Sequence, residues 1–475
     1  MRNTKLLISA MLMVSVFTFG QNRQLLYDFN EIPQSLMVNP GVDVDFKWFA
    51  GIPATNISFQ AGLSGVALND IFADDGLDFT NKFANEIIYG MTTGDELSGT
   101  FQLELINVGF RGKNEDNFYS FGVYTEGDAI GYWFSDLAIL GFEGNADNLN
   151  QRFNLSDFKT RGELLNVYHI GLNKRINNKL TIGVRAKLYS SIFDFNSTHN
   201  KGYFVTTEGV NNFYANTLDA DAEFRMSGIP SIRDAEKDGT LASTITKRAF
   251  FGGNLGAGVD LGFTYKLNDQ TVFTASLLDL GFINHSNDVK NYTLKGSATV
   301  EGVEVILPDA LANPDQDFWN ELIDEVEELI PFEDNNDSYV MFRPTKLNAS
   351  LRYNWGEQTL TGANCDCGPY ASGSDRGTRY ANSVGGHLYA INRPRGPQTA
   401  LSVFYQRRIG SVLALKTSYT VDKFSFTNIG LGFNLQAGPV NFYVLADNLL
   451  GYQNLASSHY QSFQFGLNII SWGKK

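Results

Sequence analysis

Six charged residues of this chain have the side chains that are best placed to do chemistry. They are Arg185, Lys187, Asp260, Asp279, Arg352 and Asp447, and each lies in a segment where apolar and polar residues alternate. Cations and carboxylates on one face of a sheet can neutralise one another, which buried charges require, or they can line a path for a solute or ligand. The pattern predicts a charged inner surface and leaves both uses open.

No stretch of the sequence has the spacing of a catalytic motif. The chain contains no G-x-S-x-G, H-E-x-x-H, Walker A or EF-hand pattern, and its five histidines are scattered. We therefore predict a protein that is not an enzyme and that binds no cofactor and no metal. Acid and base residues from separate strands would escape such a search, so an enzyme remains a minor alternative.

The two cysteines, Cys365 and Cys367, are separated by one residue. An exported protein could oxidise them, although a disulfide across a single residue closes a small, strained ring. Zinc sites usually take four ligands, and no nearby histidine completes a set. Incidental loop cysteines, a disulfide and a metal or redox role all stay open.

Residues 180–192 show the kind of element that positions the charged side chains. Leu180, Ile182, Val184, Ala186 and Leu188 alternate with Thr181, Gly183, Arg185, Lys187 and Tyr189. Successive side chains of a β-strand point to opposite faces, so this segment has one apolar face and one charged face. It is also long enough to cross a bilayer, for which a tilted strand needs about 9–11 residues.

The same pattern recurs to the end of the chain, for example over residues 347–355, 429–436 and 463–469. The sequence has 37 Phe, 21 Tyr and 46 Gly but only 12 Pro, as suits aromatic girdles, tight turns and uninterrupted strands. We predict an all-β fold, a transmembrane antiparallel β-barrel of about 14 strands, with 16 as the next even number and short helices in its loops.

The first 20 residues predict export. Arg2 and Lys5 precede an apolar run that ends at Gly20, which is typical of a cleaved signal peptide. We expect a signal peptide over 1–20, a single barrel domain over 21–475 and a place in a Gram-negative outer membrane, with membrane lipid as a partner. The net charge of −14 argues against nucleic acid as a partner.

The connections between the predicted strands differ in length. Short ones contain Asn, Asp or Gly, as at 176–179 and 268–270, and short turns of bacterial barrels face the periplasm. Segments 194–247 and 284–342 are then expected outside the cell. Segment 66–98 is predicted to form short helices that fold into the lumen or beneath it.

One long loop carries an amphipathic, acidic helix. Its apolar residues recur at helical spacing, and Pro331 ends it. They are Trp319, Leu322, Ile323, Val326, Leu329 and Ile330. This stripe could pack on the rim of the barrel, dock a partner or cover the lumen.

Four stretches carry a family resemblance: the opening 21–41 with Asn39-Pro40, and the segments 258–267, 276–283 and 438–451. They resemble an outer-membrane barrel family of Bacteroidota whose function is unknown. The resemblance extends distantly to the PorP/SprF barrels of type IX secretion and more loosely to FadL-type barrels. It implies an outer-membrane barrel of about 14 strands.

Two functions follow as hypotheses. The first is a scaffold or accessory barrel whose loops and 319–330 helix bind a surface or secretion-system protein. The second is a FadL-like passive transporter of hydrophobic or small solutes. A soluble exported β-sandwich is a third, weaker possibility.

Overall fold

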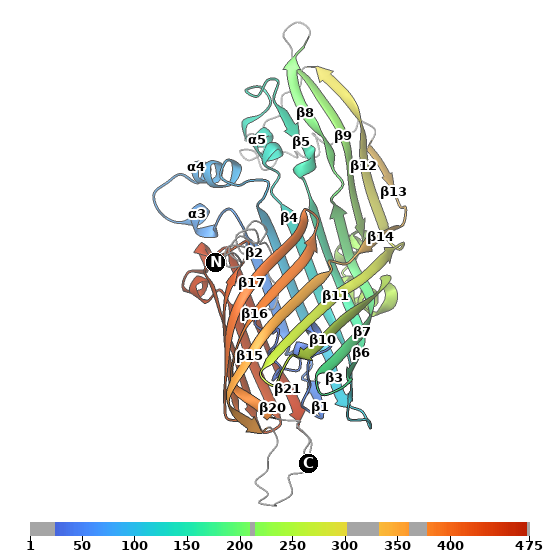
Figure 1. The fold of residues 1–475 in the computed structure, drawn as a ribbon. Helices are drawn as coiled ribbons and strands as arrows, with labels where there is room; N and C mark the ends of the chain where they lie inside the picture. The colour runs from blue at the N-terminus through green and yellow to red at the C-terminus, as the bar shows by residue number, and fades with distance from the viewer. Residues whose placement is uncertain (1–23, 210–213, 302–331, 361–377, 473–475) are drawn as a thin grey trace, which may run out of the picture.

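The alternating segments form the wall of a closed antiparallel barrel (Figure 1). The computed structural model describes residues 24–209, 214–301, 332–360 and 378–472. Over these residues the wall has 14 strand positions, as predicted. Two positions are each shared by two segments, because β1 and β2 both pair with β3 and β21, and β14 and β15 both pair with β11.

The order of strands around the wall follows the chain, and β21 closes the barrel on β1 and β2. The wall consists of β1 (Trp48–Gly51) with β2 (Ile57–Leu63), β3 (Glu96–Arg111), β4 (Asn117–Tyr132), β6 (Thr160–Arg175), β7 (Leu180–Ser197), β10 (Asn254–Lys266), β11 (Thr271–His285), β14 (Tyr339–Phe342) with β15 (Lys346–Leu360), β16 (Thr378–Arg393), β17 (Gly396–Ile409), β18 (Leu413–Val421), β19 (Asn428–Ala437), β20 (Val440–Asp447) and β21 (Tyr460–Ser471).

Strand β7 shows how the sequence pattern becomes an inside and an outside. Val184 and Leu188 are 41% and 40% exposed on the outer surface, whereas Arg185 and Lys187 between them are 3% and 6% exposed. A strand turns its side chains over at every residue, so one face meets the surroundings of the barrel and the other meets the lumen. The barrel therefore has an apolar exterior and a polar interior, as membrane barrels do.

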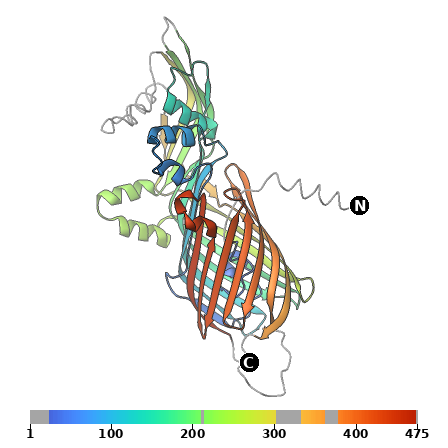
Figure 2. The same ribbon diagram turned by 90° about the vertical axis from the view of Figure 1, so that its left-hand side faces the viewer.

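The predicted short turns lie at one end of the barrel. Asn177 and Asn268 each accept hydrogen bonds through Oδ1 from two backbone N–H groups, those of Lys179 and Leu180 and those of Gln270 and Thr271. Such Asx turns explain why Asn stands at these connections. The long loops that the structure describes gather at the opposite end, which is the extracellular end in barrels of this type (Figure 2).

At the extracellular end a second sheet extends beyond the wall (Figure 1). It contains β5 (Arg152–Asn154), β8 (Lys201–Glu208), β9 (Tyr214–Ser227), β12 (Val289–Glu301) and β13 (Phe332–Asn335). The upper part of β7 joins it to the barrel by pairing Asp194–Asn196 with β9. The segments that the sequence places outside the cell therefore form ordered sheet in part.

Short helices occur in the loops, as predicted. They are α3 (Leu68–Phe72), α4 (Phe79–Lys82), η1 (Phe83–Ile88), α5 (Ser135–Glu143), η2 (Leu155–Asp157), α6 (Ile229–Lys237), α7 (Leu241–Lys247), η4 (Arg248–Gly252), η5 (Leu449–Gln453) and η6 (Leu455–Ser457). A further short helix, α2 (Ser35–Val38), lies inside the barrel and not in a loop. The prediction that segment 66–98 enters or underlies the lumen is wrong, because α3 and α4 lie outside the barrel at its extracellular end (Figure 1). Leu68 and Phe72, 51% and 69% exposed, pack too loosely to fill a lumen.

Asp422, in the loop between β18 and β19, gives the fold a pH dependence. Burial raises the pKa of its carboxyl to about 7, although the N–H groups of Phe424 and Ser425 donate to it and oppose that rise. A folded-state pKa above the unfolded value favours the protonated form, so this contribution to stability is present below pH 4 and disappears as the pH rises through 7. We expect D422N, which keeps an acceptor without the charge, to raise the unfolding temperature by a few degrees at pH 8 and by much less at pH 4.5. An equal shift at both values would contradict this.

Candidate functional site: a plugged lumen

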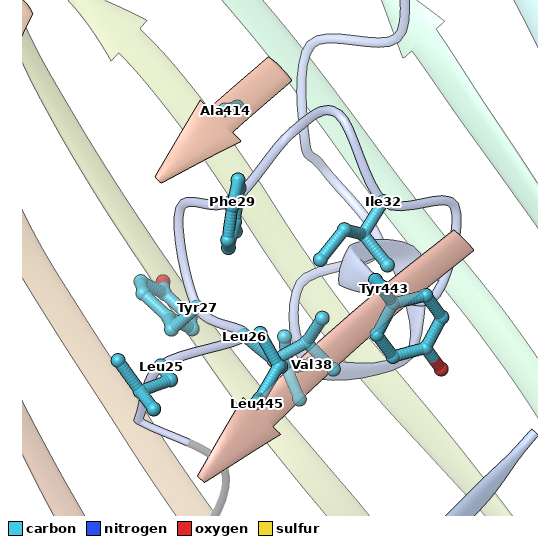
Figure 3. Close-up of a cluster of buried hydrophobic side chains, with 9 residues drawn as sticks. All are labelled: Leu25, Leu26, Tyr27, Phe29, Ile32, Val38, Ala414, Tyr443 and Leu445. Atoms are coloured by element: carbon cyan, nitrogen blue, oxygen red, sulfur yellow. The ribbon is translucent and has the colours of Figure 1, made fainter. Parts of the chain in front are cut away.

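The lumen of the barrel is filled by the N-terminal segment 24–46, which we call the plug. Its apolar side chains are buried against inward-facing residues of the wall (Figure 3). Leu26 and Phe29 are 0% exposed and pack in one cluster with Tyr443 and Leu445 of β20. Nearer β1, Val44 and Phe46 form a second cluster with Phe49 and Phe118. A 14-stranded barrel is wider than wall side chains alone can fill, and the plug occupies that space.

The plug is compact but irregular. Single turns close between Leu26 and Phe29, between Phe29 and Ile32, and between Ser35 and Asn39. Its other backbone carbonyls lie inside the barrel, where an unpaired polar group costs free energy. The wall therefore has to supply donors.

Polar side chains of the wall donate to these carbonyls. Arg185 donates to the carbonyls of Leu36 (3.1 Å) and Met37 (2.6 Å), and Ser276 donates to that of Val38 (2.6 Å). Arg352 donates to the carbonyl of Asp28 at 3.0 Å. Further donors are Lys416, which bonds the carbonyl of Tyr27, Asn173, which bonds those of Pro40 and Val42, and Arg111, which bonds those of Val44 and Phe46. The inner surface of the barrel is thus complementary to the backbone of the plug.

Beside the plug, charges of both signs alternate across five wall strands. Asp260 accepts from Arg185 and Lys187, and Lys187 also contacts Asp279 at 2.5 Å. The series goes on from Asp279 through Lys346 (2.9 Å) and Glu126 (3.3 Å) to Arg343 (2.9 Å). Every carboxylate in this series has at least one cation beside it, which is the condition for burying such charges.

Asp279 also has an unusual backbone. Its φ is +58°, and it lies where the pairing of β10 with β11 is interrupted by a bulge. Its N–H donates to Oδ1 of Asp260 at 2.7 Å. A non-glycine residue with positive φ costs about 1–3 kcal/mol, so the ion pairs of Asp279 and this hydrogen bond hold it in place.

A small cavity of about 40 Å³ lies between the plug and this series of charges. Met37 and Val38 of the plug line it, together with the apolar side chains of Tyr124, Leu278 and Tyr389 and the charged side chains of Glu126, Lys187, Asp279 and Lys346. This volume accepts about three water molecules and no larger solute. Any larger occupant requires the plug to move.

Three glycines let the plug touch the wall near Pro40. A Cβ added to Gly183 would lie 2.0 Å from the carbonyl oxygen of Pro40, and one added to Gly262 would lie 2.2 Å from Oδ1 of Asn39. A Cβ on Gly41 of the plug would lie 2.4 Å from the carbonyl oxygen of Gly262. Only glycine allows backbones to approach this closely.

We therefore expect G183A to displace the plug while the wall remains folded. The added methyl group meets backbone, which cannot rotate away, so the contacts of the plug with Asn173 are lost as well. Limited proteolysis should cut the plug of G183A at least about tenfold faster than that of the wild type. G386A is the matched control, because a Cβ there finds its nearest neighbour at 4.0 Å. Equal cleavage of both variants would show that the close contact of the plug with Gly183 does not hold it in place.

The structure places all six predicted charged residues on the inner surface. Arg185, Lys187, Asp260 and Asp279 lie together in the series of ion pairs, and Arg352 contacts the plug. Asp447 is 5% exposed and lies apart from them, near Leu25 of the plug, since a Cβ on Gly430 would meet both. A role of these residues in permeation stays a prediction.

Sequence reasoning missed the plug, and it missed Glu126, Arg343 and Lys346 as members of the series. The signal for the plug was present: 24–46 is rich in apolar residues but contains two prolines and alternates only over residues 42–46. The predicted signal peptide, the 319–330 helix and both cysteines lie outside the described residues. Among the described residues, no group of three or more His, Cys, Asp or Glu could hold a metal ion, and no helix is long and apolar enough to cross a membrane.

A closed 14-stranded antiparallel wall, an apolar exterior, a polar lumen and an internal plug define a β-barrel of the outer-membrane type. The chain belongs to the family of unknown function DUF5723, whose model matches residues 40–447. The match begins within the plug and ends with β20.

Comparison with solved structures gives similar barrels at low identity. The P. putida toluene transporter TodX is 11% identical, with 96% of this chain and 94% of that chain covered and a TM-score of 0.35. A Pseudomonas aeruginosa FadL homologue is 10% identical, with 93% and 94% covered and a TM-score of 0.40. The Ralstonia pickettii toluene transporter TbuX is 9% identical, with 93% of each chain covered and a TM-score of 0.38. No curated protein matches the sequence.

Proposed function

We propose that the protein is a passive transporter of hydrophobic or small solutes across the outer membrane and that the plug is its closure. The observation that carries the proposal is that the plug forms no part of the hydrogen-bonded wall. Each wall strand pairs with wall strands on both sides, so the barrel is complete without the plug. The plug can therefore shift without breaking the hydrogen-bonded ladder of the wall.

The contacts that hold the plug favour such a movement. Besides the apolar clusters, they include hydrogen bonds from side chains, as from Ser276 to Val38, and water entering the lumen can replace these hydrogen bonds. The cavity beside Met37 combines apolar and charged side chains, so a shift of the plug would enlarge an amphipathic space. No catalytic role is needed in this account, in which the protein is not an enzyme.

Flux measurements on the reconstituted full-length barrel test the proposal. The protein is reconstituted into vesicles with a lipopolysaccharide outer leaflet, which slows the spontaneous entry of hydrophobic molecules. Uptake of an added pyrene-labelled fatty acid or of sucrose is then measured. We expect at least one probe to enter faster than into vesicles without protein. Entry of neither probe above that background would contradict a transport role.

A scaffold for a surface or secretion-system protein is the second candidate. The specific observation in its favour is the sheet of β5, β8, β9, β12 and β13, which extends away from the barrel (Figure 2). One of its faces carries Lys201, Asp219, Asp221 and Lys295 in neighbouring register positions, a charged surface suited to a protein partner.

Gentle extraction from native membranes followed by mass spectrometry tests the scaffold. A stoichiometric surface or secretion protein that is lost when residues 315–332 are deleted would support a docking role for the helix predicted over 319–330. Retention of every partner in that deletion would exclude it. The likeness to PorP/SprF barrels stays a prediction until such a partner is found.

A further inference from the structure

A helical hairpin lies on the outer surface of the barrel. Neither the plug inside the lumen nor the extracellular sheet accounts for this hairpin. It consists of α6, α7 and η4 and is inserted between β9 and β10. Figure 2 shows the two helices projecting sideways near the extracellular end of the wall. The chain leaves β9 at Gly228 and returns to the wall at Asn254.

Burial on β7 shows which surface the hairpin covers. Ser190 continues the outward-facing series of Val184 and Leu188, yet it is 0% exposed. Ser190 Oγ donates to the carbonyl of Arg248 at 2.7 Å and accepts from the N–H of Phe251 at 3.1 Å. The base of the hairpin is therefore fixed to the outer face of the wall.

Two aromatic side chains extend outward from this base. Phe250 and Phe251 are 55% and 50% exposed, and Phe251 has a φ of +67°. Positive φ is costly for an aromatic residue and persists only where surrounding contacts impose it. Here the ring of Phe251 stacks on Tyr168 of β6 at 4.4 Å, and Tyr168 donates to the carbonyl of Ala249 at 3.0 Å.

These rings continue the apolar band of the wall. Tyr168 lies opposite Leu188 in the pairing of β6 with β7, and Ile170 on the same face of β6 is 64% exposed. Membrane barrels carry aromatic side chains at the edges of their apolar band, at the level of the lipid headgroups. The helices above the rings expose Arg233, Lys237 and Lys247 beside Asp234 and Glu236, as suits a hydrated interface.

We propose that this hairpin is an anchor for the lipid of the outer leaflet. Phe250 and Phe251 insert at the edge of the acyl layer, and α6 and α7 lie among the headgroups. The proposal requires a barrel that spans a membrane and does not depend on whether the barrel transports a solute.

Site-specific fluorescence tests the anchor in reconstituted full-length protein. Cys365 and Cys367 are first replaced by Ser, and F250C is then labelled with an environment-sensitive NBD probe. Its emission is compared in phosphatidylcholine vesicles with and without bromine on the acyl chains. I170C, on the apolar band, and F426C, 71% exposed in the loop after β18, are controls of similar exposure. We expect F250C to be blue-shifted and quenched by bromolipid at least half as strongly as I170C.

Two results would overturn the proposal. Emission like that of F426C, without quenching by bromolipid, would place the hairpin in water. A blue shift without bromolipid quenching would show that protein, such as a second copy of the chain, covers the aromatic pair. All three substitutions replace exposed side chains, and heat-modifiable migration verifies that each barrel is folded.

Discussion

Removal of residues 24–41 is expected to convert the closed barrel into an open pore. The plug fills the lumen of a 14-stranded wall, and barrels of 16–18 strands without a plug hold an aqueous channel. The deletion keeps Asp43, whose carboxylate pairs with Arg175 and Lys266 (2.8 Å each) at the end of the barrel where the short turns lie. In planar bilayers we expect conductance at least about tenfold above that of the wild type.

A peptide of residues 24–41 added to the deleted barrel supplies the control. It should restore closure, because the donors Arg185, Ser276 and Arg352 remain on the wall. A deleted barrel that folds, as judged by heat-modifiable migration, but stays impermeable would show that wall side chains close the lumen by themselves.

The second large effect is expected from D260A. Asp260 is 0% exposed and accepts from Arg185, from Lys187 at 2.9 Å and from the N–H of Asp279. Its loss leaves two buried cations with fewer partners and leaves the strained Asp279 without its acceptor. Breaking such a buried ion pair typically costs about 3–5 kcal/mol, so the free energy of unfolding in urea should fall by about that amount.

Two further substitutions make this measurement specific. D260N retains an acceptor for the N–H of Asp279 but removes the charge, so we expect an intermediate loss. D447A removes a lumenal carboxylate that is also buried, at 5% exposed, but lies outside the series of ion pairs, and we expect a loss of about 1 kcal/mol or less. Similar losses for D260A and D447A would contradict a special role for the ion pairs beside the plug.

The wall of the barrel was predictable because its signal is local. Each strand repeats with a period of two residues, as Ile182, Val184 and Leu188 alternate with Arg185 and Lys187, and Asn177 and Asn268 mark the turns. Burial of one face and exposure of the other then follow from strand geometry alone. Counting such segments limits the number of strands to 14 or 16, because pairs such as β1 with β2 share one position in the wall.

The plug was not predictable in this way because its structure depends on distant residues. Nothing near Leu36 and Met37 in the sequence indicates that Arg185 will bond their carbonyls, 149 and 148 positions away. Glu126 of β4 and Lys346 of β15 likewise meet across 220 positions, although these two strands do not pair with each other. Register between distant strands, rather than any local pattern, brings these charges together.

Movement of the plug is the central claim, and a tether between plug and wall tests it most directly. Ser276 Oγ lies 2.6 Å from the carbonyl oxygen of Val38, so V38C/S276C, with Cys365 and Cys367 replaced by Ser, places one cysteine in the plug and one at the wall residue that bonds it. Flux of the fatty-acid probe and of sucrose is measured before and after reduction of the same vesicles, with thiol titration to verify the disulfide. We predict that the oxidised protein is closed and that reduction restores the wild-type flux. Equal flux in the two states would show that solutes cross without movement of the plug, and absence of flux in both, and in the wild type, would contradict transport altogether.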